Sequence, residues 1–194
     1  MKSITTSLLL ILVSAIACPA NAEMENWYSY WGIGFSDTTY PEPLDSLLDT
    51  LEATTNTTRI QLNLDILGFY FPVGSGSTIA GFVINGAADR LDDGSDNIQI
   101  NLYTYGLSVM TFLGKEPGDG LFLRGDFGIT KAVLTSSLSS SSIGSDTGTG
   151  YLIGAGYGIV LSEGSRLLLN LNFANRTIES ENYSTTGFSV GVLF

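Results

Sequence analysis

The feature that most constrains this sequence is a two-residue alternation of apolar and polar side chains, repeated in segments of about ten residues. Residues 59–66 read RIQLNLDI, so that every second residue is leucine or isoleucine and the residues between them are charged or amides. Residues 169–173, LNLNF, repeat the pattern. Successive side chains of a strand point to opposite faces, so the pattern predicts strands with one large apolar face and one polar face.

Eight such segments are predicted, separated by clusters of Gly, Ser, Asp and Asn, as in an all-β barrel or sandwich. They are residues 27–36, 57–67, 78–89, 97–112, 121–133, 149–161, 166–177 and 185–194. The connections alternate in length. The long ones are 37–56, 90–96, 134–148 and 178–184, and the short ones are 68–77, 113–120 and 162–165. An even strand number with long connections at one end is typical of an outer-membrane barrel.

The first twenty-two residues, MKSITTSLLLILVSAIACPANA, predict a secretory signal peptide that is cleaved after Ala22. Lys2 precedes an apolar run from Leu8 to Ala17, which is too short for a spanning helix of roughly 20 residues. Any membrane embedding is therefore expected to use strands. Residues 23–194 then form one domain. The alternative is a lipoprotein site, with an acyl chain on Cys18.

The composition excludes several kinds of chemistry. The chain has no histidine, which excludes imidazole as a base, an acid or a metal ligand. Its net charge is −11, which argues against nucleic acid as a partner. Asp92-Asp93-Gly94 is a turn signal, because Leu91 and Ile100 occupy ligand places of a calcium loop that would include it. No metal, cofactor or enzymatic activity is predicted.

The apolar faces have two possible orientations. In a soluble, lipocalin-like periplasmic barrel they point inward, and in a transmembrane barrel they point to lipid. Aromatic residues near strand ends favour the second, as girdles at the two membrane interfaces. These residues are Trp27, Phe35, Phe112, Tyr151, Phe173 and Phe194.

Together, the signal peptide, the alternating segments and the terminal GFSVGVLF resemble the small eight-stranded outer-membrane β-barrel family of Gram-negative bacteria. The resemblance covers residues 27–194 and implies an antiparallel up-and-down barrel in the outer membrane, expected to be a monomer. It also implies that the barrel-assembly machinery reads the end of the chain. The residues that match this signal are Phe188, Val190, Val192 and Phe194.

An eight-stranded barrel has room inside only for side chains, so the polar faces are expected to form a packed, hydrogen-bonded core. A proton or ion path is the alternative. The residues are Arg59, Gln61, Asn63, Asp65, Asn101, Arg124, Asp126, Arg166, Asn170, Asn172 and Arg176.

The first long connection also contains a helical period, with Pro43 and Asp45 suited to the first turn. Its apolar residues are spaced i, i+3, i+4 and i+7, which predicts a short amphipathic helix. This helix is expected to pack on other loops, to cover the barrel mouth as a lid, or to bind an apolar ligand or partner. The residues are Leu44, Leu47, Leu48 and Leu51.

Acidic residues dominate the four long connections, where eleven acids accompany one base, Arg90. They favour solubility and repulsion between loops, or bridging to lipopolysaccharide phosphates through Mg²⁺ or Ca²⁺. The leading hypothesis is a non-enzymatic integral outer-membrane protein for surface structure, adhesion or envelope integrity. The alternative is transport or binding of small hydrophobic molecules. A membrane-embedded hydrolase, acyltransferase or protease is disfavoured because the chain lacks histidine.

Overall fold

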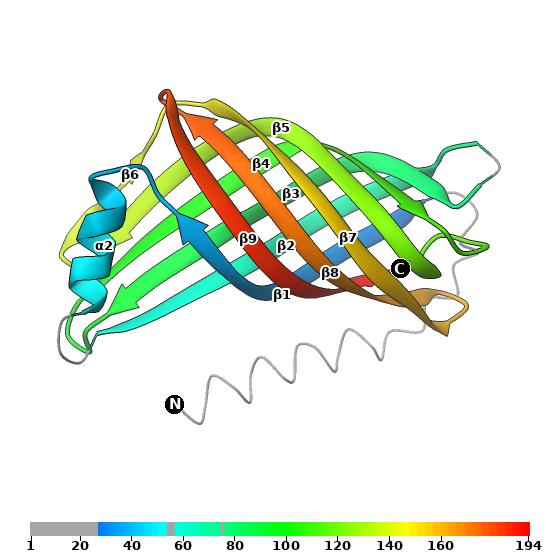
Figure 1. The fold of residues 1–194 in the computed structure, drawn as a ribbon, viewed down its shortest axis with the longest axis horizontal. Helices are drawn as coiled ribbons and strands as arrows, with labels where there is room; N and C mark the ends of the chain where they lie inside the picture. Colours follow the sequence, from blue (N-terminus) through cyan, green and yellow to red (C-terminus); the bar gives the residue numbers. More distant parts are fainter. Residues whose placement is uncertain (1–26, 54–56, 75) are drawn as a thin grey trace.

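The computed structural model describes residues 27–53, 57–74 and 76–194, so the predicted signal peptide and Cys18 lie outside the described residues. Eight long antiparallel strands form a closed barrel, and one helix lies across one end (Figure 1). The elements are β1 (Tyr28–Thr39), α2 (Leu44–Glu52), β2 (Thr58–Pro72), β3 (Thr78–Asp92), β4 (Asn97–Phe112), β5 (Gly120–Ser136), β6 (Ser139–Gly144), β7 (Gly148–Ser162), β8 (Ser165–Ile178) and β9 (Glu181–Leu193).

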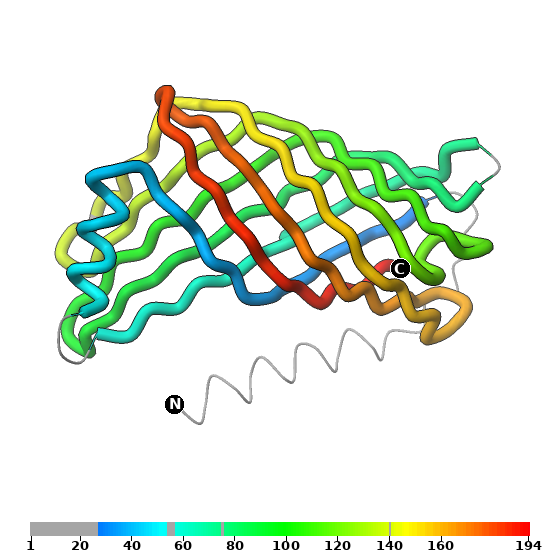
Figure 2. The backbone as a smooth tube through the Cα atoms, in the orientation of Figure 1, coloured from blue at the N-terminus to red at the C-terminus, as the bar shows by residue number. Residues whose placement is uncertain are grey.

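The barrel closes between its first and last strands. β1 pairs with β2 on one side and with β9 on the other, and the long strands between pair with their neighbours in chain order. Ser29 and Phe194 exchange two backbone hydrogen bonds of 3.0 and 2.9 Å, which extend the seam to the last residue. The predicted fold class, an eight-stranded antiparallel up-and-down barrel, is confirmed. Figure 2 shows the common tilt of the strands around it.

The predicted pattern of long and short connections is partly wrong. The chain from 178 to 184 is a hairpin between β8 and β9, turning on Glu179 and Ser180, which both have positive φ. Such two-residue turns match the twist of the strands, although this one lacks the Gly or Asn that usually signals them. Part of residues 134–148 is also strand, because β5 continues to Ser136 and pairs with β6. The sequence had predicted a long connection without a strand there.

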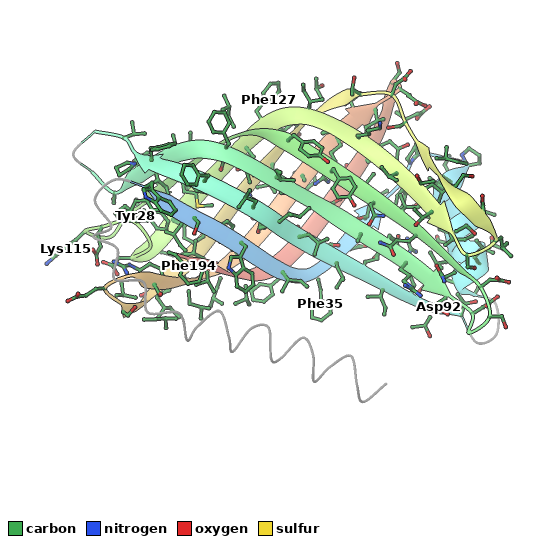
Figure 3. The ribbon with its side chains drawn as sticks, turned by 180° about the vertical axis from the view of Figure 1, so that it is seen from behind. Tyr28, Phe35, Asp92, Lys115, Phe127 and Phe194 are labelled. Carbon is green, nitrogen blue, oxygen red and sulfur yellow. The ribbon has the colours of Figure 1, made fainter. Side chains whose placement is uncertain are left out.

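The side chains on the outside of the barrel are large and apolar. Phe35 is 73% exposed and Phe127 is 65% exposed (Figure 3). Every long strand carries at least one exposed leucine, isoleucine or aromatic, and on β9 this residue is Phe188, which is 44% exposed. This arrangement contradicts the lipocalin-like alternative, in which these residues would fill the interior. Within the described ranges, no helix is long and apolar enough to cross a bilayer.

A β-bulge in β2 changes which residues point inward. It falls between Asp65 and Leu67 and shifts the pairing of β2 with both β1 and β3. A bulge adds one residue to a strand and so reverses the alternation beyond it. Tyr70 is fully buried as a result, whereas Tyr30 is fully buried because it lies on the unbroken inner face of β1. The break in alternation at Leu67 is also where the sequence had predicted the end of β2, which in fact continues to Pro72.

The interior has an apolar cluster at each end. We call the end with the connections 73–77, 113–119 and 163–164 the turn end, and the opposite end, covered by α2, the helix end. The turn-end cluster contains Tyr28, Tyr30, Tyr70, Ile79, Met110, Phe112, Phe122, Leu168 and Leu193. Phe112 was predicted in an outer aromatic girdle, but it is 2% exposed and contacts Phe122 inside. The helix-end cluster contains Tyr40, Leu48, Leu91, Ile100, Leu102 and Ile178.

Candidate functional site: the barrel interior and its covered mouth

Between the two apolar clusters lies a buried polar layer centred on Arg124 of β5. Its guanidinium forms ion pairs with Asp65 and Asp126, each at 2.7 Å, and all three side chains are at most 1% exposed. Taking charges out of water costs several kcal/mol per ion, which only close pairing and further hydrogen bonds offset. The layer therefore depends on each member keeping its partners.

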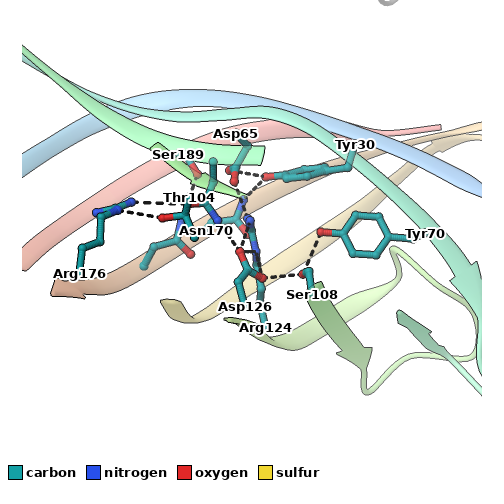
Figure 4. A network of polar contacts seen from close by, with 12 residues as sticks. Tyr30, Asp65, Tyr70, Thr104, Ser108, Arg124, Asp126, Asn170, Arg176 and Ser189 are labelled. Carbon is teal, nitrogen blue, oxygen red and sulfur yellow. Dashed lines mark hydrogen bonds and ion pairs between the residues drawn. The ribbon is translucent and has the colours of Figure 1, made fainter. Parts of the chain in front are cut away.

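Two buried tyrosines, Tyr30 and Tyr70, connect this polar layer to the turn-end cluster (Figure 4). Tyr30 donates a hydrogen bond to Asp65 at 3.0 Å, and Asn170 donates to the Tyr30 hydroxyl at 2.9 Å. Tyr70 donates to Ser108 at 2.9 Å, and Ser108 donates to Asp126. Each ring packs in the apolar cluster, while the Tyr30 hydroxyl reaches a carboxylate directly and the Tyr70 hydroxyl reaches one through Ser108, so the two layers share these side chains.

Arg176 of β8 lies on the helix-end side of the layer and is 2% exposed. It donates to Thr104 at 3.0 Å, to Thr185 at 3.2 Å and to Asn85 at 3.5 Å. Among the described residues, no carboxylate lies within 4.0 Å of its guanidinium. Asn85 also donates to Asp126 at 2.7 Å, so its amide connects Arg176 to the acidic side of the layer. Two arginines and two aspartates thus share one network.

Glycines on the inner face provide room for large side chains from facing strands. A Cβ on Gly191 of β9 would lie 2.5 Å from the Tyr30 ring, and a Cβ on Gly156 of β7 would lie 2.5 Å from Phe122. Both distances are shorter than real carbon contacts. These two strands therefore carry glycine on their inner faces where the aromatic rings of the turn-end cluster pack against them.

The mouth at the helix end is covered by α2. Leu48 is 2% exposed within the helix-end cluster, and Leu44 and Leu51 pack against that cluster. Leu47 points away and is 54% exposed. Asp45 accepts a hydrogen bond from the Tyr40 backbone N–H at 3.0 Å and so ties the first helical turn to the chain before it. Three of the four leucines predicted for a lid thus face the barrel.

One arginine fastens the helix to the barrel. Arg59 of β2 donates from Nε and Nη2 to the buried Asp89 of β3, with the Nη2 contact at 2.8 Å. Its Nη1 reaches Glu52 at 3.0 Å and Asp49 at 3.5 Å, both on α2. Gln61 donates to Asp89 at 3.0 Å. We call the Arg59 contacts with Asp49 and Glu52 the helix latch.

Burial of Tyr40 is part of the same closure. Its ring packs edge-on against Tyr183 of β9 at 6.0 Å between centroids. Desolvation, together with the nearby Asp89 carboxylate, raises the pKa of the Tyr40 hydroxyl above its usual range. The residue therefore stays neutral.

The predicted lumen residues occupy three levels, with one exception. Arg166 lies at the turn end, where it donates to the Ser162 carbonyl at 2.6 Å and pairs with Glu116 at 3.2 Å. Asn101 is the exception. Ile100 and Leu102 point into the helix-end cluster, so alternation places Asn101 on the outer face, where it accepts from Gln99 at 2.8 Å. It is 8% exposed because its neighbours cover it, not because it points inward. The structure places the others inside: Arg59, Gln61, Asn63, Asp65, Arg124, Asp126, Asn170, Asn172 and Arg176.

Sequence reasoning missed several members of the interior. Asp89 and Asn85 alternate with Ala87 and Val83 on the inner face of β3, where small residues hide the polar pattern. Tyr70 needed the bulge to point inward, whereas Tyr30 lies on the inner face of β1 with Tyr28 and Gly32, a face without charges or amides. Ser and Thr carry no clear directional signal in a strand, because they suit either face. The remaining missed residues are Thr38, Thr104, Ser108, Thr130, Thr185 and Ser189.

The residues predicted as an assembly signal lie along β9 and at the seam. Phe188 is 44% exposed on the outside, and Val190 is half-buried. Phe194 is half-buried beside β1 (Figure 3). Val192 is only 6% exposed, because it lies between Trp31 and Leu167 on the neighbouring strands. In the part of the chain that the structure describes, no three His, Cys, Asp or Glu side chains converge as a metal site.

Comparison with known proteins supports the fold and gives no closer assignment. No protein-family model matches the sequence, and no curated protein matches it significantly. Neisserial surface protein A matches with a TM-score of 0.54 and 10% identity, over 86% of this chain and 95% of that one. Ail, the attachment invasion locus protein of Yersinia pestis, gives 0.46 and 12% over 88% and 100%. The outer membrane protein OprG of Pseudomonas aeruginosa gives 0.43 and 13% over 87% and 96%. The chain therefore has the fold of the small eight-stranded outer-membrane β-barrels.

Proposed function

We propose that this protein is a non-enzymatic integral outer-membrane protein that spans the bilayer as a closed, non-conducting barrel and acts through its helix-end surface. The observation that carries the proposal is the pairing of an exposed apolar outside with a filled interior. Exposed side chains such as Phe127 and Leu171, each 65% exposed, suit hydrocarbon and not water. Surface structure, adhesion and envelope integrity are the roles that such an anchor serves.

The interior argues against transport through the barrel. The aromatic turn-end cluster, the Arg124 layer and the α2-covered mouth follow one another along the axis, and their central side chains are almost fully buried. Eight-stranded barrels have room only for such filling. The supported role is therefore that of a membrane anchor with a surface, and not of a channel.

Orientation follows from the connections between the strands. We expect the turn end, whose connections 73–77, 113–119 and 163–164 are short, to face the periplasm, and α2 to face the outside. Exposed acids at the helix end, such as Asp37 and Glu42, would then meet lipopolysaccharide. Mg²⁺ or Ca²⁺ shared with lipid phosphates is the expected link, since hard cations bind carboxylates and phosphates.

Two measurements test the proposal. The protein should fractionate with the outer membrane, resist extraction by carbonate or urea, and run at different positions on a gel when heated and unheated. Purified protein in planar bilayers should show no discrete conductance steps. Recovery from the soluble periplasm would refute the membrane location, and stable channels would refute the closed lumen.

The end of the chain has a separate proposed role as the signal for assembly. Deleting Phe194 removes two seam hydrogen bonds and one half-buried ring, a loss of at most about 3 kcal/mol of ring burial. A closed barrel should survive this in detergent. We expect the deletion to reduce assembled protein in cells far more than it reduces the unfolding free energy of refolded protein. Unchanged assembly in cells would exclude the signal.

A further inference from the structure

A cleft opens at the helix end between the end of α2 and the β3–β4 turn. It has a volume of about 190 Å³. Leu91 on its wall belongs to the helix-end cluster, and Leu51 of α2 packs against that cluster, so the cleft is an extension of the apolar mouth. Leu138, from the β5–β6 turn, closes one side and is 76% exposed. An exposed leucine beside a cleft with an apolar wall leaves apolar surface for a ligand to cover.

The rim of the cleft carries Asp92, Asp93 and Asp96. Asp92 is compensated by Arg90, whose Nη2 lies 2.8 Å from its carboxylate. Asp93 accepts from the backbone N–H groups of Ser95 and Asp96 through Oδ1, and Asp96 accepts from the Ser137 hydroxyl at 3.0 Å. Among the described residues, neither Asp93 nor Asp96 has a cationic partner within 4.0 Å.

The Asp93 carboxylate stays ionised, and hydrogen bonds hold both Asp93 and Asp96 in place. The backbone N–H groups of Asp96 and Ser95 lower the pKa of Asp93 below its ordinary value. Ser137 also holds the two turns together, because its N–H donates to the Asn97 carbonyl at 3.0 Å and its hydroxyl accepts from the Asn97 N–H at 2.9 Å. The negative rim is therefore set at a defined position above the apolar wall.

We propose that this cleft binds a small organic cation, an ammonium group attached to a short apolar chain. The chain would lie against Leu51, Leu91, Ile98 and Leu138, and the ammonium would pair with Asp93 and Asp96. The cleft is small, at about 190 Å³ against roughly 300–1,000 Å³ for typical ligand pockets, which suits a short chain of a few carbons. Binding at the mouth requires no passage through the barrel, so the inference goes beyond the anchor role and does not depend on it.

The probe is n-hexylammonium, added to the protein in nanodiscs of zwitterionic lipid and followed by methyl NMR. The Ile98 and Leu138 methyl signals should shift and saturate, while the signal of Ile153, an exposed belt residue far along β7, stays unchanged. n-Hexanol, which has the same chain without the charge, should bind more weakly. Parallel shifts of Ile153 would mean partition into lipid only, and equal binding of hexanol would remove the role of the charge; either result overturns the proposal.

A matched pair of variants tests the carboxylates. Asp93→Asn combined with Asp96→Asn should weaken hexylammonium binding about fivefold or more, since an exposed ion pair contributes up to about fivefold each. Asp146→Asn removes one charge at the same end, from the loop before β7 and outside the cleft lining, and should leave the affinity unchanged. Leu138→Ser should weaken binding without altering the charge. Equal weakening by Asp146→Asn would show a general surface potential and overturn the site.

Discussion

The two ends of the barrel interior are closed in different ways. At the turn end, aromatic side chains that belong to the strands themselves meet across the lumen, among them Tyr30, Tyr70, Phe112 and Phe122. At the helix end, the strands contribute smaller apolar residues and the charged Arg59 and Asp89, and a separate helix supplies Leu48 to complete the cluster.

This difference predicts that the helix end opens before the turn end. The turn-end cluster cannot be exposed without separating hydrogen-bonded strands, so its stability is that of the whole barrel. The helix rests on three leucines and the helix latch, so it can leave without breaking a strand pair. Segments held by few buried contacts open at lower free energy than the global unfolding.

Arg124→Met should lower the unfolding free energy most, because Arg124 pairs with two buried carboxylates in the layer between the two ends. The change leaves Asp65 and Asp126 buried without their cation, which costs about 3–5 kcal/mol when one partner of a buried pair is lost. Urea unfolding in lipid vesicles, followed by the fluorescence of Trp27 and Trp31, measures it. Glu163→Gln, in the exposed β7–β8 turn, is the control. A loss below 1 kcal/mol would show that the layer is not essential.

Phe122→Ala should cost about 3 kcal/mol of unfolding free energy, at the low end for a buried phenylalanine. Met110 in the same cluster is flexible enough to fill part of the cavity. Because the turn end has no separate closing element, the loss should appear in the global transition. Amide exchange of α2 should stay unchanged. A gain in exchange at α2 with no global loss would reverse the comparison.

Leu48→Ala removes a side chain as buried as Phe122 but should lower the global unfolding free energy by less than about 1 kcal/mol. The helix is expected to detach before the barrel unfolds, so the loss appears as faster amide exchange within α2. Leu47→Ala, at the exposed position of the same helix, is the matched control and should change neither quantity. A global loss of 2 kcal/mol or more, typical of core leucines, would show that helix and barrel unfold together.

Glu52→Gln should have the smallest effect and sharpen the comparison most. It removes the 3.0 Å contact of the helix latch, whose Glu52 end is 49% exposed, so its loss should cost α2 only about 0.2–1 kcal/mol. Arg59→Gln also leaves the buried Asp89 without its cation, so it should lower the global unfolding free energy by up to about 3–5 kcal/mol. If Glu52→Gln leaves α2 exchange unchanged, the leucines hold the helix without the latch.

Strand prediction succeeded because lipid-facing and lumen-facing residues differ strongly in polarity. β4 was predicted with its observed bounds, and β5 and β7 within a few residues. The prediction was wrong at positions whose polarity does not match the side of the barrel that they face. Asn101 is polar yet faces outward, Phe112 is aromatic yet faces inward, and the serine-rich segment 139–144 forms β6. The polarity of a strand face indicates its surroundings on average, but the backbone register determines whether a given side chain points inward or outward.

The sequence by itself determined the strands, their antiparallel order and the residues able to fill a narrow lumen, because alternation along a strand needs only the chain next to each residue. Tertiary structure alone decided the bulge that turns Tyr70 inward, the partners of Arg124 and Arg176, and the side of the mouth that Leu48 covers. Those features join residues far apart in the chain, such as Tyr30 and Asn170. Their contacts exist only after the barrel closes and brings distant strands face to face.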